Sequence, residues 1–181
     1  MFHGSLDSTI TTFKPFSHFG TKLAALQAIS KKIDANYKDP AILYEIEFDE
    51  SKINLLQAED WGSPGIIGTA RGVRDALIKL YSENNILVEE IESIRANFTR
   101  KKNNQDASYL TDGVQEVLQF LIRLDYHGIK YINNVEGTED SESICFMNSN
   151  QYIIKNKSEV NQNDIFEAQK LLRYQIIKKT G

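Results

Sequence analysis

Cysteine, proline and histidine are scarce in this chain of 181 residues, and each scarcity removes a class of protein. The only cysteine is Cys145, which excludes an intramolecular disulfide and a cysteine-rich zinc site. The three histidines, His3, His18 and His127, are too scattered to predict a metal site, and we expect none. Three prolines and ten glycines leave no long flexible linker. We therefore expect one domain over residues 1–181, held together by packing and hydrogen bonds.

Long apolar runs and an excess of positive charge are also missing. No stretch approaches the roughly 20 apolar residues of a transmembrane helix, and no basic segment followed by an apolar one marks a Sec signal peptide. We expect no membrane partner, and either a cytoplasmic protein or an effector delivered into another cell. The 21 Lys and Arg residues against 25 Asp and Glu give a net charge of -4, which argues against nonspecific capture of nucleic acid.

Two sequence periodicities are present, and together they predict an α+β fold. Residues 41–49 alternate between apolar and acidic side chains, which is typical of a strand, whereas residues 114–122 repeat apolar side chains at helical spacing. The basic and polar run 100–106 is interpreted as an exposed loop. The other expected strands are 1–5, 129–132, 143–146 and 151–154. The other expected helices are 20–33, with Thr21 as N-cap, about 73–81, 87–98, and 164–179 as a packed C-terminal helix.

Common catalytic signatures are absent, but two polar islands stand where strands should end. The sequence contains no G-x-G-x-x-G, P-loop, H-E-x-x-H or G-x-S-x-G pattern. His3-Gly4 offers an imidazole for hydrogen bonding and a backbone that a planar ligand amide can approach, and Glu142 opens a buried strand with a fixed carboxylate. The ordinary alternatives are that His3 is an N-terminal surface residue and that the acidic residues are solvated hairpin charges.

These motifs resemble those of the ADP-ribosyltransferases of the diphtheria-toxin and poly(ADP-ribose) polymerase type. His3-Gly-Ser5 is similar to their first-strand motif, and Glu142-Ser-Ile-Cys-Phe146 to their glutamate strand. His18-Phe-Gly-Thr21, followed by an Ala-rich helix, looks like the second-strand segment of the small bacterial and phage members. The stretch Gly128–Gly137 is similar to the strand and connection that precede the glutamate strand in that group. The motifs occur in the family's order and span most of the chain.

The resemblance implies a split β-sandwich of two antiparallel sheets with surrounding helices that clamps NAD. His3 would bond the adenosine ribose, Gly4 would hold the nicotinamide carboxamide through its backbone, and Ser5 would lie beside them. Glu142 would be the catalytic carboxylate, with Glu136 or Glu139 as the next candidate if the register differs. NAD would be the substrate, and no metal would be needed.

The second-strand segment would contribute His18, Phe19, Gly20 and Thr21 to NAD binding. His18 and Phe19 either line the pocket or pack behind it, and Thr21 is also the expected helix cap. The tyrosine that stacks on nicotinamide in the family has no counterpart in this segment. The stacking residue therefore stays open.

The resemblance implies a mono-ADP-ribosyltransferase, a glycosyltransferase that cleaves NAD, releases nicotinamide and transfers ADP-ribose to a protein acceptor, as a bacterial effector or toxin would. A nucleic acid or small-molecule acceptor is less expected. Cleavage of the nicotinamide–ribose bond passes through an oxocarbenium-like cation, which a nearby carboxylate stabilises. Two alternatives stay open: an NAD glycohydrolase, and a catalytically degenerate domain of the same fold that binds NAD, another nucleotide or a protein.

Overall fold

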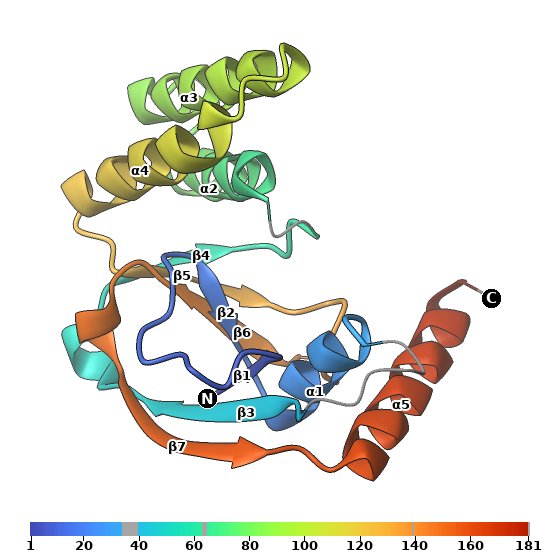
Figure 1. Ribbon diagram of the computed structural model, residues 1–181. Coiled ribbons are helices and arrows are strands. Elements are labelled where there is room, and N and C mark those ends of the chain that lie inside the picture. Colours follow the sequence, from blue (N-terminus) through green and yellow to red (C-terminus); the bar gives the residue numbers. More distant parts are fainter. Residues whose placement is uncertain (34–39, 63–64, 139, 181) are drawn as a thin grey trace.

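The computed structural model describes residues 1–33, 40–62, 65–138 and 140–180. In these residues the chain forms five α-helices and two β-sheets, which confirms the expected α+β class (Figure 1). In chain order the elements are β1 (Phe2–Ser5), β2 (Ser17–Phe19), α1 (Lys22–Ser30), β3 (Ile42–Glu47), the 3-10 helix η1 (Glu50–Lys52), β4 (Leu55–Ala58), α2 (Ile66–Leu80), α3 (Ile86–Asn103), α4 (Ser108–Arg123), β5 (Gly128–Ile132), β6 (Glu142–Phe146), the 3-10 helix η2 (Ser149–Gln151), β7 (Ile153–Glu159) and α5 (Gln162–Thr180).

The two sheets differ in how their strands pair. The first sheet has the order β1-β3-β7 and is antiparallel throughout, and the second has the order β2-β6-β5-β4. In the second sheet β4 pairs with β5 in parallel, so the expectation of two wholly antiparallel sheets is wrong at this pair. β4 was not predicted from the sequence, because Leu55-Leu-Gln-Ala58 is short and lacks alternation. A parallel pair needs a crossover connection, which α2, α3 and α4 provide.

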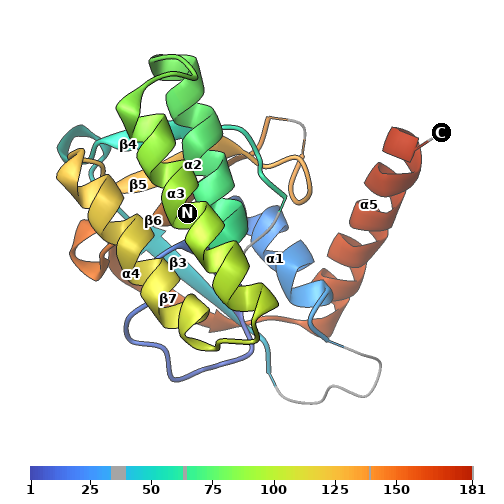
Figure 2. The same cartoon turned by 90° about the horizontal axis from the view of Figure 1, so that it is seen from above.

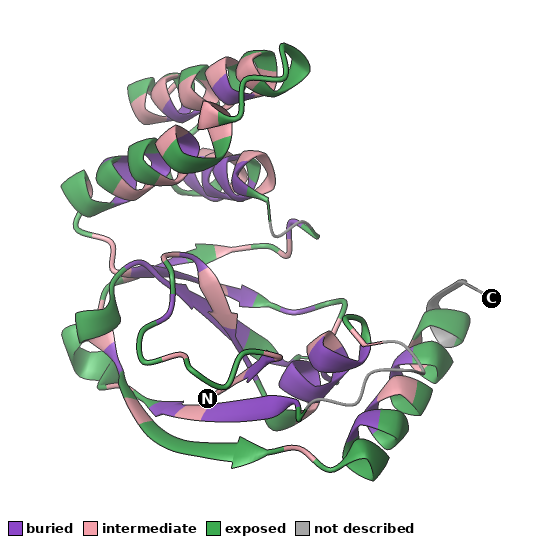
Figure 3. Ribbon diagram, in the orientation of Figure 1, coloured by how far each residue is buried: buried purple, intermediate pink, exposed green. Residues whose placement is uncertain are grey.

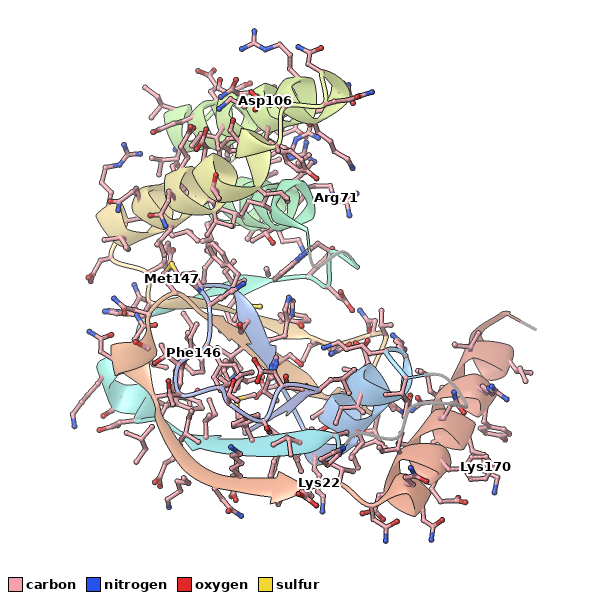
Figure 4. All side chains as sticks on the ribbon, in the orientation of Figure 1. Lys22, Arg71, Asp106, Phe146, Met147 and Lys170 are labelled. Atoms are coloured by element: carbon pink, nitrogen blue, oxygen red, sulfur yellow. The ribbon has the colours of Figure 1, made fainter. Side chains whose placement is uncertain are left out.

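The sheets share one apolar core. Phe19, Ile144 and Phe146 of the second sheet pack in one cluster with Ile42, Tyr44 and Ile46 of the first. In Figure 4 the side chain of Phe146 lies in the space between the two sheets. Figure 3 shows buried residues concentrated on the inner strands and on α1, with exposed residues along the outer side of α5 and on β7.

A layer of three helices covers the other face of the second sheet. Helices α2, α3 and α4 lie together on this side, and Figure 2 shows all three seen from above the sheet. Their apolar side chains join Ile129 of β5 and Cys145 of β6 in the largest buried cluster. The cluster also contains Trp61, from the loop that leads into α2.

Several element boundaries differ from the sequence expectation. Residues 100–103, expected in a loop, continue α3, and their cations suit the C-terminal end of a helix because its carbonyls carry partial negative charge. Leu80 and Tyr81, expected on the apolar stripe of the helix, are about half exposed because α2 ends there. The last strand was expected at 151–154 but lies at Ile153–Glu159. Gln151 belongs to η2, which precedes this strand.

Helix α1 packs closely on β1 and is covered by α5. A Cβ atom at Gly4 would lie 2.4 Å from the carbonyl oxygen of Ala25, so only glycine permits this approach of strand and helix. Leu26 and Ile29 of α1 share a buried cluster with Ile165 of α5. None of the helices in the described ranges combines the length and apolar character required to cross a membrane.

Candidate functional site

A cavity of about 350 Å³ opens where β1, β2 and α1 meet the connection between β5 and β6. Its volume falls within the range of small-molecule sites, which is about 300–1,000 Å³. Five of the residues expected to bind NAD line it: His3, Gly4, His18, Phe19 and Gly20. Two segments separated in the sequence therefore contribute to one site.

The two predicted segments meet through a single backbone bridge. Phe2 and Gly20 exchange two hydrogen bonds of 2.9 Å, each amide donating to the other residue's carbonyl. Backbone groups two residues apart in a strand point to the same side. The N–H and C=O of Gly4 therefore point to the side on which Phe2 meets Gly20, away from β3, and present a donor and an acceptor at the cavity edge.

The His3 ring is positioned by one hydrogen bond and two aromatic neighbours. Its Nδ1 lies 2.7 Å from the carbonyl oxygen of His18, and the ring centroid lies 4.6 Å from that of Phe13 and 5.5 Å from that of Phe19. Burial lowers the pKa of His3 to about 4, an effect partly offset by this hydrogen bond and reinforced by the nearby charge of Lys32. The neutral ring donates from Nδ1, which leaves Nε2 as a hydrogen-bond acceptor.

His18 belongs to a polar chain that crosses the second sheet. Its Nδ1 lies 2.6 Å from the hydroxyl oxygen of Tyr131, and Asn133 Nδ2 donates to Ser143 Oγ at 3.3 Å. Tyr131 and Ser143 are cross-strand partners on β5 and β6, and their hydroxyls also interact. Burial lowers the pKa of His18 and raises that of Tyr131, so both groups are uncharged at neutral pH. The charge of Glu136 partly offsets the shift at His18.

Glu136 brings a carboxylate to this cavity. It lies in the connection between β5 and β6, and Asn133 Oδ1 accepts hydrogen bonds from the backbone N–H groups of Val135 at 3.0 Å and of Glu136 at 2.8 Å. Lys31 Nζ lies 2.5 Å from Glu136 Oε1. The asparagine thus fixes the backbone at the start of the connection, where Glu136 pairs with a lysine at the end of α1.

Two glutamine side chains, from α1 and α5, bind the backbone of the next residue, Gly137. The Gly137 N–H donates to Gln27 Oε1 at 2.6 Å, and Gln175 Nε2 donates to the Gly137 carbonyl at 2.5 Å. Gln27 Nε2 also donates to Gln175 Oε1 at 3.3 Å, which closes a ring of hydrogen bonds between α1, α5 and the connection. Gly137 has φ +93°, a conformation that other residues rarely adopt.

Asp60 also lines the cavity, and each of its carboxylate oxygens accepts a backbone hydrogen bond. Oδ1 accepts from the N–H of Gly62 and Oδ2 from the N–H of Asn134, each at 2.8 Å. These bonds tie the loop after β4 to the connection after β5. Asp60 therefore shapes the site, because backbone hydrogen bonds at both oxygens hold its carboxylate in place.

Glu142, the expected catalytic residue, is not among the residues that line the cavity. Its side chain is 53% exposed and pairs with Lys130 at 2.9 Å. Because side chains alternate along β6, Glu142 shares the face of Ile144, whereas Ser143 turns to the cavity. Glu139, one of the two residues named as the next candidate, lies outside the described residues.

Ser5 and Thr21 have local structural partners instead of a place on the cavity wall. Ser5 Oγ accepts from the N–H of Asp7 at 3.0 Å. Thr21 Oγ1 accepts from the N–H of Ala24 at 3.1 Å, which confirms it as the N-cap of α1.

The cavity is also lined by residues for which no role was predicted, namely Tyr131, Asn133, Lys31 and Lys32. A usable signal was present for Asn133, since asparagine directly after a strand commonly bonds the backbone two residues ahead. The lysines gave no such signal because charged residues near a helix C-terminus have a sufficient reason in the helix dipole.

The comparisons with protein-family models, with curated proteins and with solved structures found no significant match to this chain. Within the described part of the chain, no three His, Cys, Asp or Glu side chains are grouped so that they could hold a metal ion.

Proposed function

We propose that the cavity binds NAD and that the protein is a mono-ADP-ribosyltransferase with a protein acceptor. One observation carries the proposal: the His3-Gly4 and His18–Gly20 segments, expected from the sequence to bind NAD, line one cavity together with a carboxylate, Glu136. The two sheets that share a core around Phe19 and Phe146 are compatible with the split β-sandwich of the resemblance.

The polar groups of the cavity suit a nicotinamide nucleoside. Neutral His3 offers Nε2 as an acceptor for a ribose hydroxyl, and the backbone of Gly4 offers a donor and an acceptor to a planar carboxamide. His18, Phe19 and Tyr131 are the aromatic candidates for stacking on the nicotinamide ring. These groups supply positioning, which lowers the barrier by holding the reacting atoms in place.

Glu136 is the better candidate than Glu142 for the carboxylate of the reaction. It lines the cavity, its side chain is 21% exposed, and its charge acts on both His18 and Tyr131. In the proposed reaction the nicotinamide–ribose bond breaks and its electron pair leaves with neutral nicotinamide. The carboxylate stabilises the positive charge that develops on the ribose. The acceptor atom then bonds to the ribose carbon, and its proton passes to the carboxylate or to water.

The test compares wild type, Glu136→Gln and Glu142→Gln with NAD and a cell lysate. Nicotinamide release and the mass added to acceptor proteins are both measured. We expect Glu136→Gln to lower both by about 100-fold to 1,000-fold, the usual effect of removing one charge-stabilising group. In Glu142→Gln both quantities should stay within about threefold of wild type. The ion pair between Glu142 and Lys130 is partly exposed, and its loss should have little effect.

The outcomes separate the alternatives. A larger loss in Glu142→Gln than in Glu136→Gln would return the catalytic role to Glu142. Nicotinamide release without mass transfer would identify an NAD glycohydrolase. If folded wild type released no nicotinamide but bound ADP-ribose in calorimetry, it would be a binding domain, and absence of both would refute the proposal.

A further inference from the structure

Two lysines at the C-terminal end of α1 face the same cavity as the neutral histidines. Lys31 and Lys32 both line it, and Lys31 pairs with Glu136 at 2.5 Å. Lys32 has no ion pair within the described ranges, and its charge contributes to the lowered pKa of both His3 and His18. One wall of the cavity therefore carries two positive charges, only one of which is neutralised by a carboxylate.

The Glu136 backbone is fixed, whereas among the described residues Lys31 alone is paired with its side chain. Asn133, Gln27 and Gln175 hold the backbone of Glu136 and Gly137 through hydrogen bonds. The Lys31 and Glu136 side chains are 39% and 21% exposed, and ion pairs of this kind contribute little net free energy. An anion of higher charge that enters the cavity can replace the Glu136 carboxylate as the partner of Lys31, and the backbone of the connection need not move.

We propose that Lys31 and Lys32 form a diphosphate subsite, and that a bound diphosphate displaces Glu136 from Lys31 and so frees the carboxylate. This inference rests on the proposed function and adds a condition to it. While Glu136 is paired with Lys31, its charge is neutralised and it stabilises a developing cation poorly. The negative charges of a diphosphate match the two lysines and bind them through charge-assisted hydrogen bonds.

The proposal predicts that the protein distinguishes substrates by their phosphates. NAD carries a diphosphate between its two nucleosides, so it would both bind the lysines and free Glu136. Nicotinamide riboside has the same bond to be cleaved but no phosphate, so it would leave the Lys31–Glu136 pair intact. Removal of the Lys31 charge should therefore affect the two substrates in opposite directions.

The kinetic test measures nicotinamide release from NAD and from nicotinamide riboside. In Lys31→Gln we expect KM for NAD to rise about tenfold and kcat/KM for the riboside to rise at least threefold, because Glu136 is no longer paired. Lys22→Gln is the matched control, since Lys22 is exposed at the opposite end of the same helix and does not line the cavity (Figure 4). Equal losses with both substrates in Lys31→Gln, or no change with either, would overturn the proposal.

A binding test separates this inference from the proposed function. Inorganic pyrophosphate is titrated by calorimetry into wild type, Lys31→Gln, Lys32→Gln and Lys22→Gln, each first shown by its melting temperature to be folded. We expect affinity to fall at least fivefold in Lys31→Gln and in Lys32→Gln, and to be retained in Lys22→Gln. Pyrophosphate binding of this pattern in a protein that neither cleaves NAD nor binds ADP-ribose would support the subsite and refute the proposed function. Equal affinity in all four proteins would refute the subsite even if NAD is cleaved.

Discussion

At the scale of single residues, the properties of His3 come from its surroundings rather than from its place at the N-terminus. The ring packs against both Phe13 and Phe19, and its Nδ1 donates to the His18 carbonyl. Burial penalises the imidazolium and Lys32 adds a repulsive charge, and together these effects outweigh the hydrogen bond to the His18 carbonyl, which favours the charged ring. The histidine can thus serve as a hydrogen-bond acceptor over the whole neutral pH range.

The lowered pKa of His3 predicts how stability changes with pH. The folded protein has a pKa of about 4 at this residue and the unfolded chain about 6.5, so the unfolded state binds the extra proton between these values. The contribution of His3 is therefore fully present above pH 6.5 and is lost as pH falls toward 4, by about 3 kcal/mol at the most. Urea denaturation at a series of pH values measures it.

The matched variant for this prediction is His3→Asn. Its side-chain amide can still donate to the His18 carbonyl, but it does not titrate. Between pH 6.5 and 4 the free energy of unfolding should fall less steeply in His3→Asn than in wild type. Identical slopes in the two proteins would show that His3 is not protected from protonation.

At the scale of secondary structure, α1 and α5 act together on the connection that carries Glu136. Gln27 is fully buried, and both polar atoms of its side chain are bonded, one to Gly137 and one to Gln175. A buried amide without such partners would be costly, so the two glutamines depend on each other. The C-terminal helix α5 therefore has two roles: it packs on the core, and it supports the connection that lines the cavity.

This dependence can be measured with a double-mutant cycle. Gln27→Leu leaves the Gly137 N–H buried without its partner and should cost about 1–3 kcal/mol in the free energy of unfolding. Gln175→Leu should cost less, because Gln175 is only partly buried. The double variant should lose about 0.5–1 kcal/mol less than the sum of the two, as expected for residues in one network. Strict additivity in urea denaturation would show that the ring of hydrogen bonds does not act as a unit.

The elements with clear periodicity could be predicted from the sequence, and those determined by distant partners could not. The apolar repeat from Val114 to Ile122 predicted α4, whereas β4 is recognisable only through its pairing with β5. At the site, the segments around His3 and His18 were predicted to contribute and both line the cavity. The register of β5 and β6, together with Gln175, determines which glutamate faces the cavity. Neither can be predicted from the local sequence pattern.

At the scale of the whole molecule, the second sheet is buried between two apolar cores. The cluster shared with the first sheet covers one face, and the cluster with α2, α3 and α4 covers the other. Cys145 lies on the helical side and has no exposed surface. Burial raises the pKa of its thiol well above the usual range, which keeps it protonated and unreactive.

The single cysteine therefore reports on unfolding of the whole molecule. A thiol reagent should leave the native protein unmodified at neutral pH over hours and should label it completely in denaturing urea, with mass spectrometry as the measurement. In intermediate urea the labelled fraction should follow the unfolded fraction measured by circular dichroism. Rapid labelling without urea would mean that the helical layer opens on its own from the sheet.

The order of pairing in the two sheets also has a consequence for synthesis of the chain. β4 pairs with β5, and β2 pairs with β6, so the first ladder of the second sheet can form only after β5 has left the ribosome, and the sheet is complete only after β6 has followed. The ring that holds Gly137 additionally needs Gln175, which is made later still. A nascent chain that already contains His3, His18 and Glu136 therefore lacks the assembled cavity, and any activity that the cavity confers begins only after α5 has been translated and has docked.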